Sequence, residues 1–205
     1  LGVKVSMKDE IQVNGIPIER EEPVYYLLYK PKSVISSVKD DRNRKVVTDF
    51  IPTDKRIFPI GRLDFDTTGV LLLTNDGDFA HLLTHPKFEI EKTYIAKVKG
   101  IITPPVIHQL KRGVKLEDGK TSPAKVKLLK RDRRKQTSLI ELVIHEGRNR
   151  QVKRMLEAVG HPVIKLKRER FAFLDCEGMN PGDYRELNPK EVKQLIALAT
   201  TRPRL

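Results

Sequence analysis

Two carboxylates stand just ahead of the most apolar run in the chain. Asp64 and Asp66 are followed by residues 70–73, which read Val-Leu-Leu-Leu. Four successive aliphatic residues predict a strand buried on both faces, and a rigid buried strand is a good support for a catalytic carboxylate. Residues two apart in an extended segment point to the same side, so we expect Arg62 to share that side with both aspartates. The spacing alone does not decide which of the two aspartates is the catalytic group. The alternative is a charged turn with no catalytic role.

A second concentration of charge surrounds the start of a predicted helix. Residues 149–159 carry apolar side chains at i, i+3, i+4 and i+7 from Val152 onward, which is typical of one helix face. A helix N-terminus attracts anions, and the arginines and lysines around it favour a phosphate backbone over an ordinary solvated surface. A further basic stretch follows at 165–170. The candidate phosphate contacts are Arg148, Asn149, Arg150, Lys153, Arg154, Lys165 and Lys167.

The chain as a whole is basic. Its 205 residues include 40 Lys and Arg against 27 Asp and Glu, a formal net charge of +13. This excess indicates a polyanionic partner, most simply nucleic acid, with a basic surface kept for solubility as the alternative. The sequence has no apolar stretch long enough for a membrane span, and its five histidines have no zinc-site spacing. A single cysteine, Cys176, excludes an intrachain disulfide, and we expect a cytoplasmic location.

Local patterns predict the elements that must position these residues. The predicted strands are 24–29, 57–60, 70–73, 92–99, 122–129, 137–145 and 162–174. The predicted helices are 76–83, a helix capped by Thr103 and stopped by Gly113, 149–159, and 189–199. Strands and helices do not alternate regularly. The pattern therefore predicts an α+β fold with a mixed, mainly antiparallel sheet flanked by helices.

Two glycine-containing segments predict hairpins. Residues 113–121 superficially match a phosphate-binding loop, but five residues separate the glycines where that motif has four, and a strand follows where the motif needs a helix. Asn14-Gly15, flanked by alternating apolar residues, is a strong hairpin signal near the start of the chain. Because the chain opens at Leu1 without a Met, we expect it to be a fragment of a longer protein.

Four segments together resemble a known enzyme family. These segments are 61–77, 83–86, 91–94 and 146–155. In their combination, order and spacing, they resemble the ribosomal-RNA pseudouridine synthases of the RsuA/RluB type over about residues 22–200. The sequence Glu-Gly-Arg-Asn-Arg from Glu146 is more similar to the large-subunit, RluB-like branch.

The resemblance implies roles for individual residues. Asp64 corresponds to the catalytic aspartate, Tyr94 to the active-site tyrosine that stacks on uracil, and Lys153 to the active-site basic residue. Arg62, two residues before the aspartate, would help to displace the flipped base. The family needs no metal and no organic cofactor.

The resemblance also implies a domain organisation and a partner. Residues 1–21 are similar to the end of a small N-terminal RNA-binding domain with its linker, and 22–205 to the catalytic domain. The implied substrate is ribosomal RNA or a pre-ribosomal particle, bound by a monomer away from membranes. The alternative is a non-catalytic RNA-binding ribosome-assembly factor with the same fold. The joint presence of Asp64, Tyr94 and Lys153 argues against it.

Overall fold

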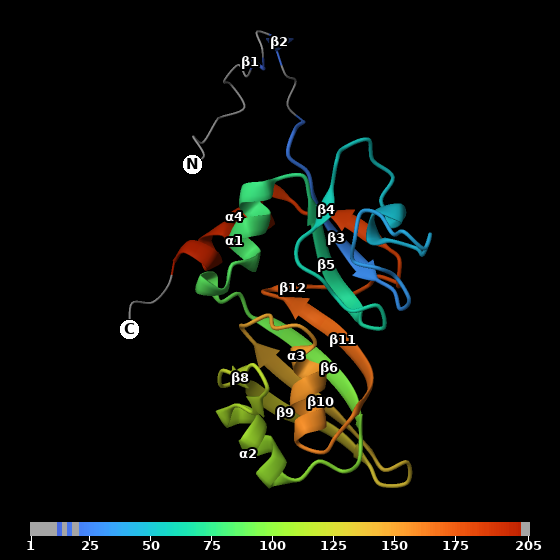
Figure 1. Ribbon diagram of the computed structural model, residues 1–205, viewed down its shortest axis with the longest axis vertical. Helices are drawn as coiled ribbons and strands as arrows, with labels where there is room; N and C mark the ends of the chain where they lie inside the picture. The colour runs from blue at the N-terminus through green and yellow to red at the C-terminus, as the bar shows by residue number, and fades with distance from the viewer. Residues whose placement is uncertain (1–11, 14–15, 18–20, 202–205) are drawn as a thin grey trace.

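The fold is organised around one large sheet, shown in Figure 1. The computed structural model describes residues 12–13, 16–17 and 21–201. In this part of the chain, the sheet follows the order β13-β3-β5-β11-β6-β10-β9, with β4 beside β5 and β12 beside β11. All strand pairs are antiparallel except β5 with β11, which is parallel. Its strands are β3 (Tyr25–Lys30), β4 (Phe58–Pro59), β5 (Thr68–Thr74), β6 (Lys92–Lys99), β9 (Lys125–Asp132), β10 (Thr137–Ile144), β11 (Val163–Phe171), β12 (Leu174–Asp175) and β13 (Tyr184–Glu186).

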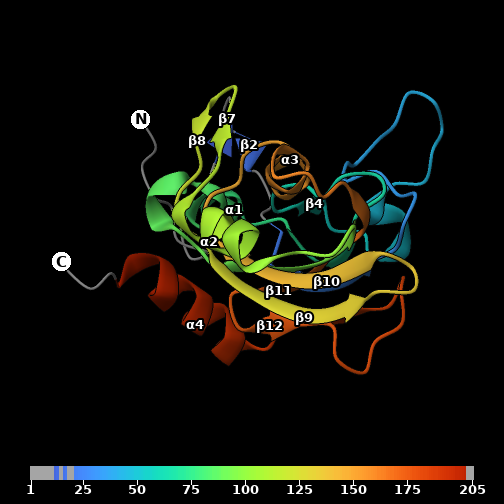
Figure 2. The same cartoon turned by 90° about the horizontal axis from the view of Figure 1, so that it is seen from below.

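Helices flank this sheet on both faces. α2 and α3 pack on the β6–β10 half of the sheet, where they share a core with these strands (Figure 2). α1 and α4 lie together at the other half and share a core with β5 (Figure 1). The predicted α+β class with a mixed, mainly antiparallel sheet is confirmed. The helices are α1 (Gly77–Thr84), α2 (Pro104–Arg112), α3 (Gln151–Ala158) and α4 (Pro189–Thr200), with the short 3-10 helices η1 (Val47–Phe50) and η2 (Pro86–Phe88).

Strand β5 is buried on both faces, as its four aliphatic residues predict. Val70 and Leu72 face a core shared with α1 and α4, whereas Leu71 and Leu73 face a second core that contains η1. None of the four is more than 1% exposed. Burying such side chains contributes roughly 2 kcal/mol each, so the end of β5 next to the aspartates is held firmly.

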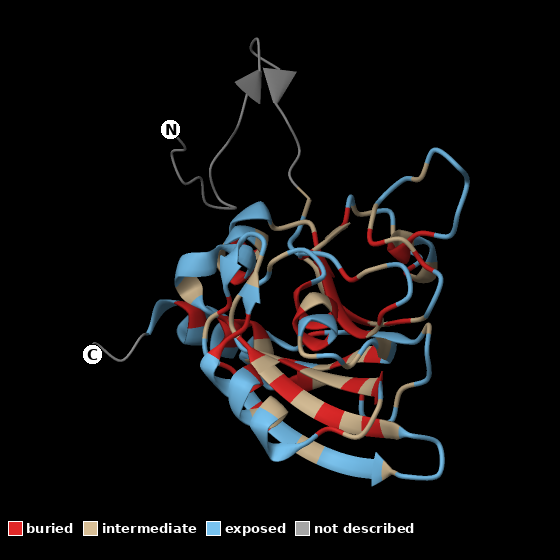
Figure 3. Ribbon diagram, turned by 60° about the horizontal axis from the view of Figure 1, so that its bottom comes forward, coloured by how far each residue is buried: buried red, intermediate tan, exposed pale blue. Residues whose placement is uncertain are grey.

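A third core supports the other half of the sheet. Ala96 and Val98 of β6 pack with residues of β10, α2 and α3. Because side chains alternate along a strand, Lys92 and Tyr94 lie on the same face of β6 as these two buried residues. The edge strand β9 is largely exposed, while buried residues gather between the inner strands and the helices (Figure 3).

Both predicted hairpins are present. β7 (Lys115–Leu116) pairs antiparallel with β8 (Gly119–Lys120), so residues 113–121 form a hairpin as the motif analysis predicts. β1 (Gln12–Val13) pairs antiparallel with β2 (Ile16–Pro17). The predicted turn between them lies outside the described residues, as does most of the segment 1–21. The domain boundary after residue 21 therefore stays a prediction.

Several predicted boundaries need correction. α3 begins at Gln151 because Arg150 adopts a left-handed backbone with φ of 52°, which no helix continues. The Thr103 side chain makes no capping hydrogen bond to α2. Strand β11 ends at Phe171 and turns back into β12, so residues 162–174 are not one strand. β9 begins at Lys125 and extends to Asp132, three residues beyond the predicted end at 129.

The only parallel pairing among the described strands joins the two halves of the sheet, and it depends on a glycine. Gly69 of β5 pairs with Arg168 of β11 and has φ of +116°. A Cβ at Gly69 would lie far inside van der Waals contact of the Arg168 backbone carbonyl. A side chain here must therefore push the two strands apart.

We expect Gly69→Ala to lower the free energy of unfolding by about 3 kcal/mol or more, the sum of backbone strain and overpacking. Gly119→Ala is the matched control, because Gly119 has a similar φ of +110° but no atom near its Cβ position. The control should lose about 1 to 2 kcal/mol from strain alone. Urea denaturation of both variants measures the difference, and equal losses would contradict the steric explanation.

Candidate active site

A cavity of about 180 Å³ opens where the turn after Gly61 meets β6 and the start of α3. It contains the three residues proposed for catalysis, Asp64, Tyr94 and Lys153. Among the predicted RNA contacts, the cavity walls include Arg62, Arg148 and Arg150, whereas Asn149, Arg154, Lys165 and Lys167 lie elsewhere.

Lys153 is the centre of this cavity's charge arrangement. Its side chain is 7% exposed, and its ammonium lies 3.0 Å from Asp64 Oδ2. The same ammonium donates a short hydrogen bond to Asp66 Oδ1. This hydrogen bond is the main reason that the pKa of Asp66 is lowered. Asp66 is the more exposed aspartate, with 58% of its side chain accessible against 31% for Asp64.

A turn, and not an extended segment, brings Asp64 and Asp66 to the same lysine. Residues 61–67 form no strand, and the Thr67 amide donates to the Asp64 carbonyl at 3.0 Å, which closes a turn with Asp66 inside it. The expected extended segment is therefore wrong. Asp66 belongs to the turn, and in addition it contacts Lys153.

The sequence reasoning missed Lys30, which supports this turn from behind. Lys30 is fully buried, and its ammonium donates to the carbonyls of Thr67 at 2.7 Å and Pro31 at 2.9 Å. Burial lowers the pKa of Lys30 to about 8, although Asp66 and Asp64 oppose this shift. The available signal was its register, because Lys30 follows the buried Leu28 at a spacing of two on β3.

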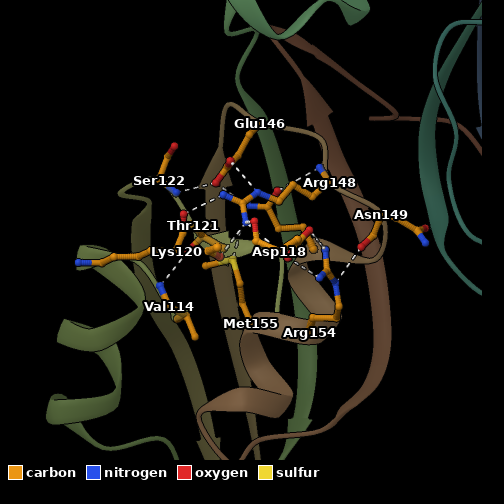
Figure 4. A network of polar contacts seen from close by, with 12 residues as sticks. Val114, Asp118, Lys120, Thr121, Ser122, Glu146, Arg148, Asn149, Arg154 and Met155 are labelled. Atoms are coloured by element: carbon orange, nitrogen blue, oxygen red, sulfur yellow. Dashed lines mark hydrogen bonds and ion pairs between the residues drawn. The ribbon is translucent and has the colours of Figure 1, made fainter. Parts of the chain in front are cut away.

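Arg148 and Arg154 are engaged inside the protein, as Figure 4 shows. Arg148 donates to the carbonyls of Gly119 at 2.8 Å and Lys120 at 2.7 Å. Arg154 forms a bidentate pair with Asp118, at 2.8 and 3.1 Å. Both arginines thus fasten the β7–β8 hairpin to the start of α3.

Several residues around α3 that are predicted to contact RNA take part in this network. Glu146 completes the network by accepting from the Ser122 amide at 2.6 Å and from Arg148 at 3.2 Å. Asn149 contributes its backbone carbonyl to Arg154, and its side chain points away from the network (Figure 4). RNA contacts by Arg148, Asn149 and Arg154 stay predictions.

A basic groove adjoins the cavity on the other side of Lys153. It has a volume of about 520 Å³ and shares Arg150 and Lys153 with the first cavity. Lys165 and Lys167 lie in this groove together with Lys32 and Lys97. Acidic residues are fewer there, Asp66 and Glu157. The groove offers a positively charged path that leads to the aspartates.

Comparison with known proteins shows the family of this chain. The RNA pseudouridylate synthase family matches residues 24–158, which include the aspartate turn, β6 and α3. The chain belongs to this family. Its members isomerise uridine to pseudouridine in RNA.

Relatives of this synthase support the assignment over most of the chain. The "Ribosomal large subunit pseudouridine synthase B" of Bacillus subtilis is 64% identical over 97% of this chain and 82% of its own length. An RNA pseudouridine synthase of Aquifex aeolicus is 36% identical over 96% of this chain and 79% of its own. The crystal structure of a pseudouridylate synthase superposes with a TM-score of 0.76 at 32% identity, covering 94% of this chain and 83% of that one.

The described residues of the synthase lack two kinds of feature. Between residues 21 and 201 and in the two short described strands before them, His, Cys, Asp and Glu side chains form no group of three that could hold a metal ion. Within the same residues, no helix has both the length and the apolar character needed to cross a membrane.

The buried position of Lys30 predicts an unusual pH dependence of stability. An unfolded lysine has a pKa near 10.4, so between about pH 8 and that value the unfolded chain holds a proton that the folded protein has lost at this site. Rising pH therefore favours the folded state. We expect the wild type to gain stability relative to Lys30→Met between about pH 7 and about pH 10, measured by urea denaturation.

Leu28→Met provides the control for this measurement. Leu28 is equally buried on the same face of β3 but carries no titrating group. Its unfolding free energy should run parallel to that of the wild type at every pH. A constant difference between wild type and Lys30→Met would contradict the proposed shift.

Proposed function

We propose that the protein converts a uridine of large-subunit ribosomal RNA to pseudouridine, with Asp64 as the carboxylate that acts on the ribose. The observation that carries this proposal is the Asp64 side chain in the cavity wall, ion-paired with the buried Lys153. The choice of RNA is supported by the 64% identity to the Bacillus subtilis enzyme, whose name specifies the large ribosomal subunit.

The reaction suits a site with one catalytic carboxylate. The bond between ribose C1′ and uracil N1 must break, and the ring must rejoin the ribose through C5. A glycosidase needs a second carboxyl group to protonate its leaving sugar oxygen. Uracil leaves as a delocalised anion, so no such acid is required. Asp64 can serve either as the nucleophile at C1′ or as the base that removes a ribose proton.

The contacts of Asp64 are compatible with either role. Lys153 contacts Oδ2, and Oδ1 has no hydrogen-bond partner within the described chain, so one oxygen is oriented and the other is open to the ribose. Lys30 holds the turn behind it through the Thr67 carbonyl. Tyr94 lines the same cavity, where it would stack on the uracil ring.

The target uridine must leave its base stack to reach Asp64, at a cost of a few kcal/mol. Arg62 is exposed at the cavity and would occupy the space that the base vacates. Lys165, Lys167 and Arg150 would bind the RNA backbone along the basic groove and offset part of this cost. The proposal includes a monomer that acts in the cytoplasm with no metal or organic cofactor.

The two aspartates that share Lys153 provide a matched test. We expect Asp64→Asn to reduce pseudouridine formation by roughly 10³-fold or more, since the reacting carboxylate is lost. Asp66→Asn removes the same charge from Lys153 and should stay within roughly tenfold of the wild type, because only positioning changes. The substrate is large-subunit RNA from cells without the corresponding enzyme, and mass spectrometry measures the product. Full activity in Asp64→Asn would refute the assignment.

The basic groove predicts a salt-dependent contribution to RNA binding. We expect the double variant Lys165→Gln/Lys167→Gln to bind the RNA more weakly and to reduce the slope of log affinity against log salt by about 1 per lysine. Lys190→Gln/Lys193→Gln removes equal charge from α4, which lines none of the cavities described above, and should leave the slope unchanged. Filter-binding titrations at several salt concentrations measure both slopes. Equal slopes for the two double variants would exclude the groove as the RNA path.

A further inference from the structure

Lys92 is a charged residue of the cavity that the proposed mechanism leaves without a role. It is the first residue of β6, two before Tyr94, so both side chains lie on the same face of the strand. It lines the reaction cavity and also a neighbouring cavity of about 320 Å³. Residues two apart on a strand are separated by roughly 7 Å, so the side chains of Lys92 and Tyr94 leave β6 close to each other.

The ammonium of Lys92 has no partner within the described part of the chain. No hydrogen bond or ion pair is formed by it there, and the charges that act on it are Arg168, which repels it, and Glu146, which attracts it. Both neighbours are engaged elsewhere. Glu146 accepts from Ser122, Arg148 and Gln151, and Arg168 donates to the Val70 carbonyl at 2.8 Å.

An unpaired cation in such surroundings lowers the stability of the folded protein. Burial lowers the pKa of Lys92 to about 8, with a smaller contribution from Arg168. An uncompensated buried charge destabilises the folded protein unless something else compensates it. Among the described residues only Glu146 compensates this charge, and it does so without a hydrogen bond or ion pair to Lys92, so a negatively charged group of the substrate is the natural candidate for a direct partner.

We propose that Lys92 is a catalytic residue that donates a hydrogen bond to the uracil oxygen on which negative charge develops as the C1′–N1 bond breaks. This inference rests on the proposed function, because it needs uridine in the cavity. It does not depend on whether Asp64 attacks C1′ or removes a ribose proton. In both cases the uracil separates from the ribose with the bonding electron pair.

The electrons and protons balance without any added reactant. The pair of the C1′–N1 bond moves into the uracil ring and is shared with its carbonyl oxygens. Lys92 keeps its proton and stabilises this charge by a hydrogen bond. When the ring joins C1′ through C5, the electrons form the new bond, and the C5 proton is finally lost while N1 gains one. A preorganised donor aimed at developing charge is an effective form of catalysis in a site with little water.

The surroundings of Lys92 favour the base over a phosphate. Its cross-strand neighbours are Ile144 of β10 and Phe171 of β11, and both of these apolar residues line the cavity. The arginines suited to phosphates, Arg62 and Arg150, are exposed, whereas Lys92 is half-buried. A hydrated phosphate is better bound by the exposed arginines, and a flat ring fits the apolar wall.

Lys92 is also electrostatically separate from the two aspartates. Asp64 and Asp66 are paired with Lys153 and influence Lys30, but neither is among the charges that act on Lys92. Lys153 and Lys92 therefore act on different groups, although other cations also line the cavity. Lys153 orients the carboxylate proposed to react, and Lys92 is available for the charge that the leaving uracil acquires.

The first test compares Lys92→Met with Lys99→Met, an exposed lysine at the other end of β6. In single-turnover reactions on large-subunit RNA, Lys92→Met should form pseudouridine about 100-fold more slowly, the usual effect of losing one such donor. Its affinity for the RNA should stay within about twofold of the wild type, and Lys99→Met should match the wild type in both respects. Lys92→Arg, which keeps a charged donor, should recover part of the rate. If Lys92→Met does not fold, Lys92→Gln replaces it.

The second test separates stabilisation of uracil from binding of phosphate or from a structural role. Fluorine at C5 withdraws electrons and stabilises the departing uracil by itself. On RNA with 5-fluorouridine at the target, the ratio of the wild-type rate to the Lys92→Met rate should therefore be at least about tenfold smaller than on normal RNA. The rate is measured as loss of 5-fluorouridine. Equal defects on both RNAs, a wild-type rate, or weakened RNA binding would overturn the proposal. Failure of the wild-type enzyme to modify large-subunit RNA would instead refute the proposed function.

Discussion

The double ion pair of Lys153 is the interaction on which the rest of the site depends. Lys153 comes from α3 and the aspartates from the turn before β5, 87 residues away for Asp66. A lysine buried this deeply is strongly destabilising without its carboxylates, because its charge has left water. The pair therefore stabilises the packing of α3 against the turn, and the same geometry orients Asp64, the carboxylate proposed to react. In this proposal one contact serves both stability and catalysis.

Several of the other basic residues hold the elements on either side of this contact in place. Lys30 binds the carbonyls of the turn, and Arg148 and Arg154 bind the β7–β8 hairpin to the start of α3. A guanidinium that donates from two of its nitrogens, to carbonyls or to a carboxylate, is held in one orientation. It therefore restricts the relative movement of the elements that it joins. A net charge of +13 thus overstates the surface available to RNA. The basic groove contains the lysines proposed for RNA binding, Lys165 and Lys167, of which Lys167 also pairs with Glu169 at 3.2 Å.

The fold also explains why charged side chains can be held so rigidly. β5 is buried on both faces and meets β11 across Gly69, so the two halves of the sheet are joined where the aspartate turn ends. Tyr94, Lys92 and α3 belong to the other half. The cavity lies at this junction, where side chains from both halves meet in a preorganised arrangement.

Features that depend on local periodicity and turn chemistry could be predicted from the chain. The aliphatic run of β5, the alternation in β6, the amphipathic α3 and the hairpin at 113–121 all follow from neighbouring residues, and the motifs indicated the family. Three contacts could be seen only in the folded protein: Asp66 joins Asp64 at Lys153, Lys30 supports their turn, and Arg148 and Arg154 bind within the protein. These contacts join residues distant in the chain. They depend on how the turn closes and how the strands cross, which no local pattern encodes.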